Sequence, residues 1–489
     1  MLVTDAFVLL FLVTQGLFLV ASYVFAVSGA DDLFVDTLYY TFVAWYRSPL
    51  AGRTEERLFE ETGHVPPRPL AIMLPAWDEA SILYPAVTGI MRRLDYPSYW
   101  IFIGVYPNDA ATQKAANRLA AEHDNLRVVT TNNDGPTCKA DCVNTIIAEI
   151  EKFEQEQNIF FAGIVMQDAE DILNPNALHV FNASLELADV VQLPVLSLPR
   201  RRRNLTAGHY MDEFAEFHSK EVLVRGFLTG TVPGAGVGTC YSKKTIETAK
   251  SISGTDENGI PEVFNIGSLT EDYDLAMRLT GKGLTHHLLW VHPAKKSDHT
   301  DFAVTQELFP SGFWQSVRQK TRWTIGIAFQ GWAQLGWKGG LADKYFYWRD
   351  RKMVFFSHAI IIGYISLFFY WGLRLYERLA PDAYHLPPLL PEDSPFWYVI
   401  WFNVLLLAHR LIQRHIWTGY HYGLRALAPV TLRYFVSIII NYIAMMRAIK
   451  TWIRHLGTGE VIGWDKTAHD YPEEESLELA IPVEQEAQT

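Results

Sequence analysis

Cysteine is scarce in this chain, with three residues among 489, so a scaffold held together by disulfide bonds is excluded. Positive charge is also in deficit, because 42 Lys and Arg face 54 Asp and Glu for a formal net charge of −12. This balance argues against nucleic acid as a partner. A disordered chain is excluded as well, since 49% of the residues are hydrophobic, 13% are aromatic and only 20% are charged.

The hydrophobic residues are concentrated in four long runs. Residues 6–27 and 353–373 contain no charged side chain, and each run is long enough as a helix to cross a hydrocarbon core of about 30 Å. The first run could also be a cleavable signal peptide, but no basic residue precedes it, which favours a retained helix. A third run, 396–416, has basic residues near its end. The fourth, 430–449, contains arginine and either spans the membrane or lies in its interface, and we favour the interface.

Basic residues orient the chain across the membrane. By the positive-inside rule, both ends of the polar region between the first two runs are expected in the cytoplasm. The basic residues concerned are Arg47, Arg53, Arg57 and Arg68 at one end, and Lys344, Arg349, Arg351 and Lys352 at the other. The sequence predicts four parts: an N-terminal transmembrane helix at 1–30, a cytoplasmic domain with interfacial helices at 31–345, a transmembrane and interfacial region at 346–456, and an acidic, disordered tail at 457–489.

Strand-length apolar runs alternate with helical patterns in the polar region. The expected strands are 70–76, 100–106, 126–131, 159–167 and 190–196, and the expected helices between them are 78–94, 110–122 and 138–153. This alternation predicts an α/β fold with a mostly parallel sheet, covered on both faces, and a site at the carboxyl ends of the strands. No Gly-x-Gly-x-x-Gly motif follows the first strand, so a dinucleotide-binding fold is not supported.

Acidic residues stand where three of these strands end. Asp78 follows the first strand, Asp109 the second, and Asp168, Glu170 and Asp171 the fourth. Any one such acid is more often a helix N-cap, and Asp78 and Asp171 suit that role. Together, however, clustered acids are costly unless a cation shares the site. Oxygen ligands suit Mg²⁺ or Mn²⁺, whose coordination substrate phosphates would complete, and this indicates a diphosphate substrate.

Four motifs in this region resemble those of membrane-embedded family 2 glycosyltransferases, the group of the cellulose and hyaluronan synthases. They are Asp109, Asp168-Ala-Glu170, Thr270-Glu271-Asp272 and Gln319-Lys-Thr-Arg322-Trp323, in this order. Further strings, among them GPTCKADCVN, TAGHYMDEFAEFHSKE and LTEDYDLAMRL, resemble the Nfr-type subset, which serves in polysaccharide secretion and phage adsorption. The resemblance covers roughly residues 5–470. The chain departs from the family's Asp-x-Asp motif in having Glu170 in place of the second Asp. A second departure is that no PilZ-type arginine signature is evident, which puts regulation by cyclic-di-GMP in doubt.

The resemblance implies a GT-A catalytic domain in residues 31–345 and a role for each motif. Asp272, with Glu271 beside it, would be the general base that deprotonates the acceptor hydroxyl in an inverting displacement. The donor nucleotide-sugar would be bound by Asp109, Lys139, Asp141, Asp168, Gln319 and Arg322, the ion Mg²⁺ or Mn²⁺ by Asp168 and Glu170, and the acceptor by Trp323.

The expected function is that of a hexosyltransferase in the inner membrane of a bacterium. It would move a sugar from a UDP-sugar, with UDP-N-acetylhexosamine suggested by the resemblance, to a growing exopolysaccharide. Its partners would be the donor, the polysaccharide acceptor, the lipid bilayer and a periplasmic or outer-membrane secretion component. One alternative is a polyprenyl-phosphate sugar transferase, but such enzymes generally lack the Gln-x-x-Arg-Trp motif that this chain has. The other is a non-catalytic membrane receptor or scaffold, but such a protein would be expected to have lost Asp272 or the metal acids, and all are present.

Overall fold

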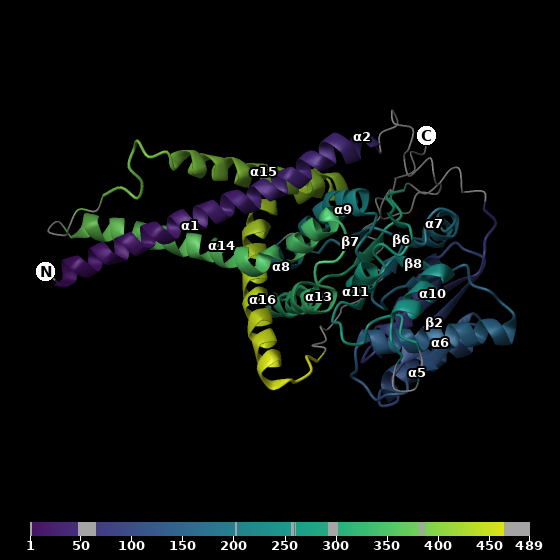
Figure 1. Cartoon of the computed structure of the whole chain (residues 1–489). Coiled ribbons are helices and arrows are strands. Elements are labelled where there is room, and N and C mark those ends of the chain that lie inside the picture. The colour runs from purple at the N-terminus through teal and green to yellow at the C-terminus, as the bar shows by residue number, and fades with distance from the viewer. Residues whose placement is uncertain are drawn as a thin grey trace, which may run out of the picture.

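The computed structural model describes residues 2–46, 65–200, 203–255, 259, 261–291, 302–380, 385 and 387–463. These residues form an α/β body and a bundle of long helices that extends from one side of it (Figure 1). Arg47, Arg53 and Arg57, on which part of the predicted orientation depends, lie outside the described residues. So does the acidic end of the chain, 464–489.

The body is built on a seven-stranded sheet with the order β3-β2-β1-β4-β8-β6-β9. Strand β8 is antiparallel to both of its neighbours, and the other pairings are parallel. The mostly parallel α/β fold expected from the sequence is therefore confirmed. The strands are β1 (Leu70–Pro75), β2 (Tyr99–Val105), β3 (Leu126–Thr130), β4 (Gly163–Met166), β6 (Val190–Gln192), β8 (Thr239–Ser242) and β9 (His286–Leu288), and a smaller sheet joins β5 (Ile172–Leu173), β10 (Thr305–Glu307) and β7 (Val195–Ser197).

Alternating side chains of β1 contribute to two hydrophobic cores, one on each face of the sheet. Leu70, Ile72 and Leu74 belong to one core, whereas Ala71 and Met73 belong to the other. Because both faces of the central strands are buried, polar side chains gather at the strand ends. The covering helices are α4 (Leu83–Arg93), α5 (Ala110–Glu122) and α7 (Ala177–Ser184) on one face, and α6 (Lys139–Gln157), α10 (Lys243–Ile252) and α11 (Glu271–Arg278) on the other.

Three elements differ from the sequence-based expectation. Strand β4 is shorter than predicted, since the chain leaves α6 through Asn158 in a left-handed conformation and needs the next residues to enter the sheet. The predicted strand 190–196 divides into β6 and β7, which belong to different sheets, and Pro194 between them has no N–H for a strand ladder. The helix predicted at 78–94, which is α4, begins at Leu83 rather than at Asp78, because Asp78 has a φ of 54°, which is not helical.

Four long helices contain the apolar runs: α1 (Leu2–Leu38), α14 (Leu341–Leu379), α15 (Trp397–Tyr422) and α16 (Val430–Thr458). Among the described residues, three stretches are long and apolar enough to cross a membrane, namely Ala6–Tyr46, Leu341–Leu379 and Val430–Thr458. Helix α15, which contains the third predicted span, is not one of them, and its apolar run is interrupted by polar side chains such as Asn403 and His409.

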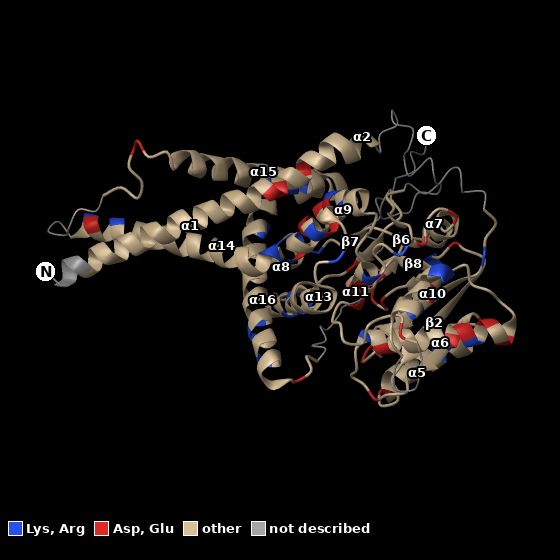
Figure 2. Ribbon diagram, in the orientation of Figure 1, with Lys and Arg blue, Asp and Glu red and all other residues tan. Residues whose placement is uncertain are grey.

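The direction of α16 differs from that of the other three long helices. Helices α1, α14 and α15 run side by side away from the body, whereas α16 lies across them where they meet it (Figure 1). Long stretches of α1, α14 and α15 have no charged residues, and charges gather where these helices reach the body (Figure 2). Helix α16 is apolar enough to span but does not run alongside the other three long helices, and its expected place in the membrane interface stays a prediction.

Candidate active site

A cavity of about 450 Å³ lies at the carboxyl ends of β1 and β4. Its wall at the sheet includes Pro75 and Asp168, and it extends to Arg410 and Arg414 on α15, at the base of the helical bundle. This position agrees with the rule that open α/β sheets bind ligands beyond the carboxyl ends of their strands. The cavity therefore joins the sheet edge, where the sequence placed its acids, to the long helices.

Lys139 is the cation at the centre of the acidic part of the cavity. Its Nζ lies 2.5 Å from Oδ1 of Asp168 and 3.9 Å from Oε1 of Glu271, and it donates a hydrogen bond of 3.2 Å to the carbonyl oxygen of Gly236. Burial acts to lower the pKa of Lys139, but the charges of Asp168 and Glu271 outweigh it and raise the pKa above its usual value. The start of α6 thus holds a permanent positive charge in the cavity.

Glu271 and Asp272 begin helix α11, after Thr270 at its N-cap. Burial raises the pKa of Glu271 to about 7, against the opposing effect of Lys139 and with a further increase from the charge of Asp272. Burial likewise raises the pKa of Asp272. A cavity carboxyl group whose pKa is shifted toward neutrality is suited to accept a proton from a substrate.

A glycine-rich loop closes over Asp272, and its importance was not predicted from the sequence. A Cβ atom at Gly234 would lie 2.8 Å from the backbone oxygen of Asp272, and one at Gly236 would lie 3.2 Å from its Oδ2. Gly236 also has a φ of 76°, which residues with a side chain rarely adopt. The signal that could have revealed this loop is the run Gly-Ala-Gly-Val-Gly at 234–238.

Asp168 and Glu170 both line the cavity. The neighbouring Asp171 has two buried carboxylate oxygens without a hydrogen-bond partner among the described residues, and burial, followed by the charges of Glu307 and Glu170, raises its pKa. Within the described ranges, no group of three or more His, Cys, Asp or Glu is arranged to hold a metal ion by itself. Two carboxylates nevertheless fit Mg²⁺ or Mn²⁺ when phosphate oxygens complete the coordination.

Helix α12 (Phe313–Thr324) brings Gln319, Arg322 and Trp323 to the cavity. The chain continues into η4 (Ile325–Gln330), which packs directly on the start of α11. A Cβ atom at Gly326 would collide with Oγ1 of Thr270, and Gln330 accepts a 2.8 Å hydrogen bond from the backbone N–H of Leu269. The Gln-x-x-Arg-Trp and Thr-Glu-Asp motifs, which are about 50 positions apart in the sequence, are therefore neighbours in space.

Trp323 belongs to an aromatic cluster beside the cavity. Its ring lies edge-on to Tyr210, with centroids 6.2 Å apart, and to Phe309 at 6.4 Å. The rings of Tyr210 and Phe309 stack at 4.5 Å. The indole is thus held by packing on helix α8 (Leu205–Glu216) and on the segment that follows β10.

Asp109 and Asp141 are not among the described residues that line the cavity. Asp109 is the N-cap of α5 and accepts a 3.1 Å hydrogen bond from the N–H of Thr112, while its Oδ2 accepts a 2.7 Å bond from the N–H of Asp78. Asp141 lies in the first turn of α6. At this end the lining residues include Trp77 and Tyr106, whose rings meet edge-on at 5.0 Å and which were not predicted from the sequence.

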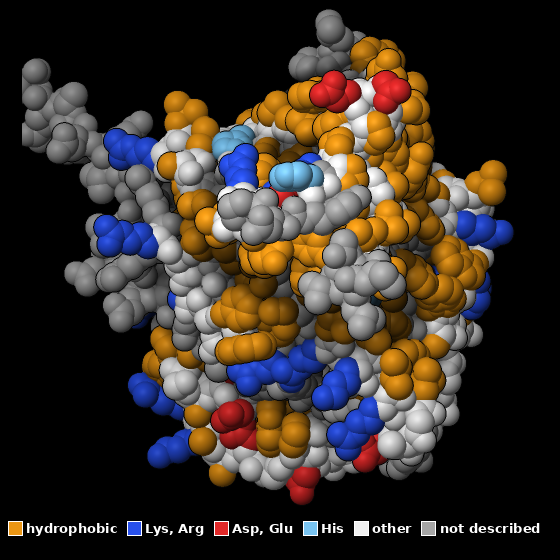
Figure 3. Space-filling model, turned by 90° about the vertical axis from the view of Figure 1, so that its left-hand side faces the viewer, with side chains coloured by type: hydrophobic (Ala, Val, Ile, Leu, Met, Phe, Trp, Pro, Cys, Tyr) orange, Lys and Arg blue, Asp and Glu red, His pale blue; other side chains and the backbone are white. Residues whose placement is uncertain are grey.

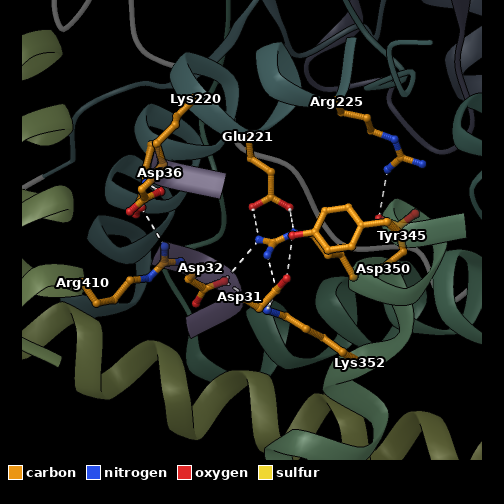
Figure 4. Close-up of polar contacts among 12 residues, drawn as sticks. Asp31, Asp32, Asp36, Lys220, Glu221, Arg225, Tyr345, Asp350, Lys352 and Arg410 are labelled. Carbon is orange, nitrogen blue, oxygen red and sulfur yellow. Dashed lines mark hydrogen bonds and ion pairs between the residues drawn. The ribbon is translucent and has the colours of Figure 1, made fainter. Parts of the chain in front are cut away.

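A network of ion pairs joins the body to the long helices (Figure 4). Acids of α1 lie at its centre and face bases from the other elements. Asp31 and Asp32 pair with Arg349 and Lys352 of α14, Arg349 also pairs with Glu221, and Asp36 pairs with Lys220 of η3 (Phe217–Glu221). Lys220 pairs in addition with Glu216, which binds Arg410 and Arg414 of α15.

A further set of polar contacts reaches α11. Asp350 of α14 accepts a 2.6 Å hydrogen bond from the hydroxyl group of Tyr273 and a 3.0 Å bond from Arg225 on α9 (Val222–Thr229). Tyr273 directly follows Asp272 in the sequence. The acid at the start of α11 is therefore connected through one side chain to a helix of the bundle.

Comparisons with known proteins agree with this geometry. A family model described as "Glycosyltransferase like family 2" matches residues 66–326. The chain is 36% identical over 458 residues to bacteriophage adsorption protein B of Escherichia coli K12, and likewise to bacteriophage N4 adsorption protein B of Escherichia coli O157:H7. Each match covers 91% of this chain and 60% of the relative, so the chain spans about 60% of the length of these curated relatives.

Solved structures of low sequence identity also resemble the chain. A mannosyltransferase from Pyrobaculum calidifontis, in complex with GDP-Man and Mn²⁺, is 14% identical with a TM-score of 0.47, and the match covers 88% of this chain and 99% of that one. TarS 1–349 of S. aureus is 9% identical with a TM-score of 0.33, over 83% of this chain and 98% of that one.

Proposed function

Because the chain belongs to glycosyltransferase family 2, we propose that it is an inverting hexosyltransferase that moves a sugar from a UDP-sugar to a growing exopolysaccharide. The observation that carries this proposal is the meeting of Asp272, Lys139 and Arg322 in one cavity that extends to the long helices. The acid is suited to activate an acceptor hydroxyl, and the two cations are suited to bind a diphosphate.

In the proposed reaction, the Asp272 carboxylate takes the proton of the acceptor hydroxyl. The oxygen so activated attacks the anomeric carbon, the bond from that carbon to the diphosphate breaks, and the nucleoside diphosphate leaves with inversion of configuration. Lys139 and Arg322 stabilise the negative charge that develops on the leaving group, and Gln319 donates hydrogen bonds beside them. A divalent cation held by Asp168 and Glu170 would neutralise further charge on the diphosphate.

The two ends of the cavity suit the two substrates. We assign the end with Trp77 to the donor nucleotide, since a partly accessible aromatic ring packs well against a base. The buried ring of Tyr106 holds Trp77 edge-on, and Asp109 and Asp141 support this end from α5 and α6. Trp323 would offer an aromatic face to the acceptor sugar. UDP-N-acetylhexosamine is the proposed donor.

We further propose that the protein is placed in a bacterial inner membrane with its α/β body in the cytoplasm. This orientation is supported by the basic residues Arg349 and Lys352, which precede the apolar part of α14. The four-part division at residues 30, 345 and 456 is part of the same proposal. The acceptor polysaccharide would leave toward the periplasm, where a secretion component would receive it.

Substitution of the proposed base tests the reaction directly. We expect purified protein in detergent with Mg²⁺ or Mn²⁺ to release UDP from a UDP-sugar, and we expect Asp272→Asn to lower the rate about 10²- to 10⁴-fold, as for loss of a general base. UDP binding, measured by calorimetry, should be retained. Asp124→Asn is the control, because Asp124 is exposed at the opposite, amino end of β3. Unchanged turnover in Asp272→Asn would refute the base assignment, and no turnover of any UDP-sugar by the wild type would refute the donor class.

A further inference from the structure

Helix α16 has an exposed apolar row along much of its length. The exposed side chains Leu432, Ile439, Ile453 and Leu456 range from 50% to 68% accessible, and with Phe435 and Met446 they recur at helical spacing. An apolar row left open on a crosswise helix is the mark of an interfacial helix whose apolar face enters the lipid. Figure 3 shows hydrophobic side chains across much of this side of the molecule, with Lys and Arg side chains gathered in its lower part.

A basic groove of about 560 Å³ lies beside this row, between α12 and α16. Among the described residues, five Lys or Arg side chains line it, against one carboxylate, that of Glu460. Glu460 pairs with Arg454 at 2.9 Å, but both side chains are more than half exposed, and such pairs contribute little. The Nε of Arg318 is buried and has no hydrogen-bond partner in the part of the chain that the structure describes. The cations are Arg318, Arg322, Arg447, Lys450 and Arg454.

We propose that this groove binds the phosphate headgroup of an anionic phospholipid, whose acyl chains lie along the exposed apolar row of α16. The basic positions 447, 450 and 454 follow one another at helical spacing, and Lys450 lies one helical turn from the apolar residues Met446 and Ile453. The charges and the apolar row are therefore adjacent on the helix surface. This is the arrangement in which cations meet headgroups while apolar side chains meet lipid tails.

A membrane lipid fits this groove better than a free phosphate or nucleotide. The phosphate is common to all three ligands, but only the lipid also covers apolar surface such as Ile453 and Leu456. The groove shares Arg322 and Leu269 with the catalytic cavity, so the headgroup would lie next to the proposed diphosphate site without occupying it. The lipid site does not require the proposed sugar transfer, and it can be tested without measuring turnover.

The test uses the full chain purified in an uncharged detergent and titrated with short-chain phosphatidylglycerol or phosphatidylcholine, with bound lipid counted by native mass spectrometry. We expect phosphatidylglycerol to bind at least tenfold more tightly. The double variant Lys450→Gln/Arg454→Gln should bind it about 30-fold more weakly, given about 1 kcal/mol for each cation near an anionic surface. The matched control Lys114→Gln/Lys152→Gln removes two charges from exposed positions on α5 and α6 and should bind like the wild type.

Three results would overturn the proposal. They are equal affinity for the two lipids, equal affinity of the double variant and the control, and displacement of phosphatidylglycerol by inorganic phosphate at equal phosphate concentration, which would indicate a site for free anions. The melting temperature without lipid reports whether the double variant is folded. If it is not, the single variant Lys450→Gln should show a loss of about fivefold, and unchanged affinity there would overturn the proposal as well.

Discussion

At the scale of single residues, the surroundings of the proposed base, Asp272, depend on two glycines that have no side chain. Gly234 and Gly236 allow the loop after α9 to approach Asp272 so closely that a Cβ atom at either position would press on it. The carboxylate is thereby shielded from water on one side, and this burial contributes to its raised pKa.

We expect Gly236→Ala to lower kcat at least tenfold while the protein still folds. The added methyl group would crowd Oδ2 of Asp272 at 3.2 Å and displace the proposed base. The matched control is Gly230→Ala, because Gly230 has a similar φ of 69° but no atom lies within 4 Å of the place that its added methyl group would take. Both variants should lose about 1 kcal/mol of stability from the positive φ. Equal kcat values in the two would show that the contact with Asp272 is unimportant.

Glu271 should make stability depend on pH in a defined direction. Its pKa rises from 4.5 to about 7 in the folded protein, so between these values the folded state holds a proton that the unfolded chain has released. The free energy of unfolding therefore falls as pH increases through this window, by about 1.4 kcal/mol per pH unit. Melting curves from pH 4.5 to 8 should show a steeper decline for the wild type than for Glu271→Gln. Parallel declines would contradict the buried, proton-holding state of Glu271.

The sequence was informative about residues that belong to motifs and uninformative about their neighbours. Lys139, Asp168 and Asp272 line one cavity, because the carboxyl ends of neighbouring strands meet and α11 begins beside them. Trp77 and Tyr106 line the same cavity but were not predicted, since only the folded chain brings these two strand ends together. Their functional roles, like those of the motif residues, stay predictions.

At the scale of secondary structure elements, α11 and α14 are joined by a hydrogen bond as well as by the packing of Tyr273 with Tyr347 in one hydrophobic cluster. Tyr273, the neighbour of Asp272, donates to Asp350 of α14, which also accepts from Arg225. Loss of one such hydrogen bond costs on the order of 1 kcal/mol, which is enough to let the start of α11 shift within the cavity.

We therefore expect Tyr273→Phe to reduce kcat about fivefold to tenfold with little change in the KM for the donor, because the phenyl ring keeps its packing while the hydrogen bond to Asp350 is lost. Tyr345→Phe is the matched control, since Tyr345 lies on α14 itself and donates a 2.6 Å hydrogen bond to Asp31 on α1, away from α11. Steady-state kinetics decide the question. A purely structural role of Tyr273 would instead lower the melting temperature and leave kcat unchanged.

Element types followed from the sequence more reliably than element ends. Continuous apolar runs located β1 and β2 within one residue of their limits, because strands buried on both faces need apolar side chains on both faces. The apolar pattern could not show that the run 190–196 forms two strands, β6 and β7, which pair in different sheets. Nor could it decide the direction of α16, because length and composition alone allow that helix to span.

At the scale of the whole molecule, buried ion pairs fasten the body to the long helices. Lys220 is only 2% exposed and pairs with Asp36 of α1 and Glu216 of α8, so one ammonium group compensates acids from two elements. Removing one partner of a buried ion pair is strongly destabilising. Without Lys220, Glu216 would keep Arg410 and Arg414, whereas Asp36 would lose its ammonium partner and keep the contact with His409.

We expect Lys220→Met to lower the free energy of unfolding by about 3–5 kcal/mol, measured by thermal melting in detergent. Lys250→Met is the control, since Lys250 pairs with Glu151 at 2.5 Å but at a more accessible site, with side chains 21% and 32% exposed. Its loss should stay below about 1 kcal/mol. Equal losses in the two variants would mean that the network at the base of the bundle does not hold the molecule together.

The hydrogen bond between Tyr273 and Asp350 also positions the start of α11 relative to the uncharged stretch of α14. Asp350 stands three positions before Met353, where the uncharged stretch of α14 begins, and three residues of helix rise about 4.5 Å. Asp350 therefore lies within one helical turn of this uncharged stretch, and Asp272 is the sequence neighbour of the tyrosine that donates to it. Under the proposed function, a sugar joined at Asp272 would be added next to the helix that enters the membrane, so the growing polysaccharide would begin its path close to the lipid.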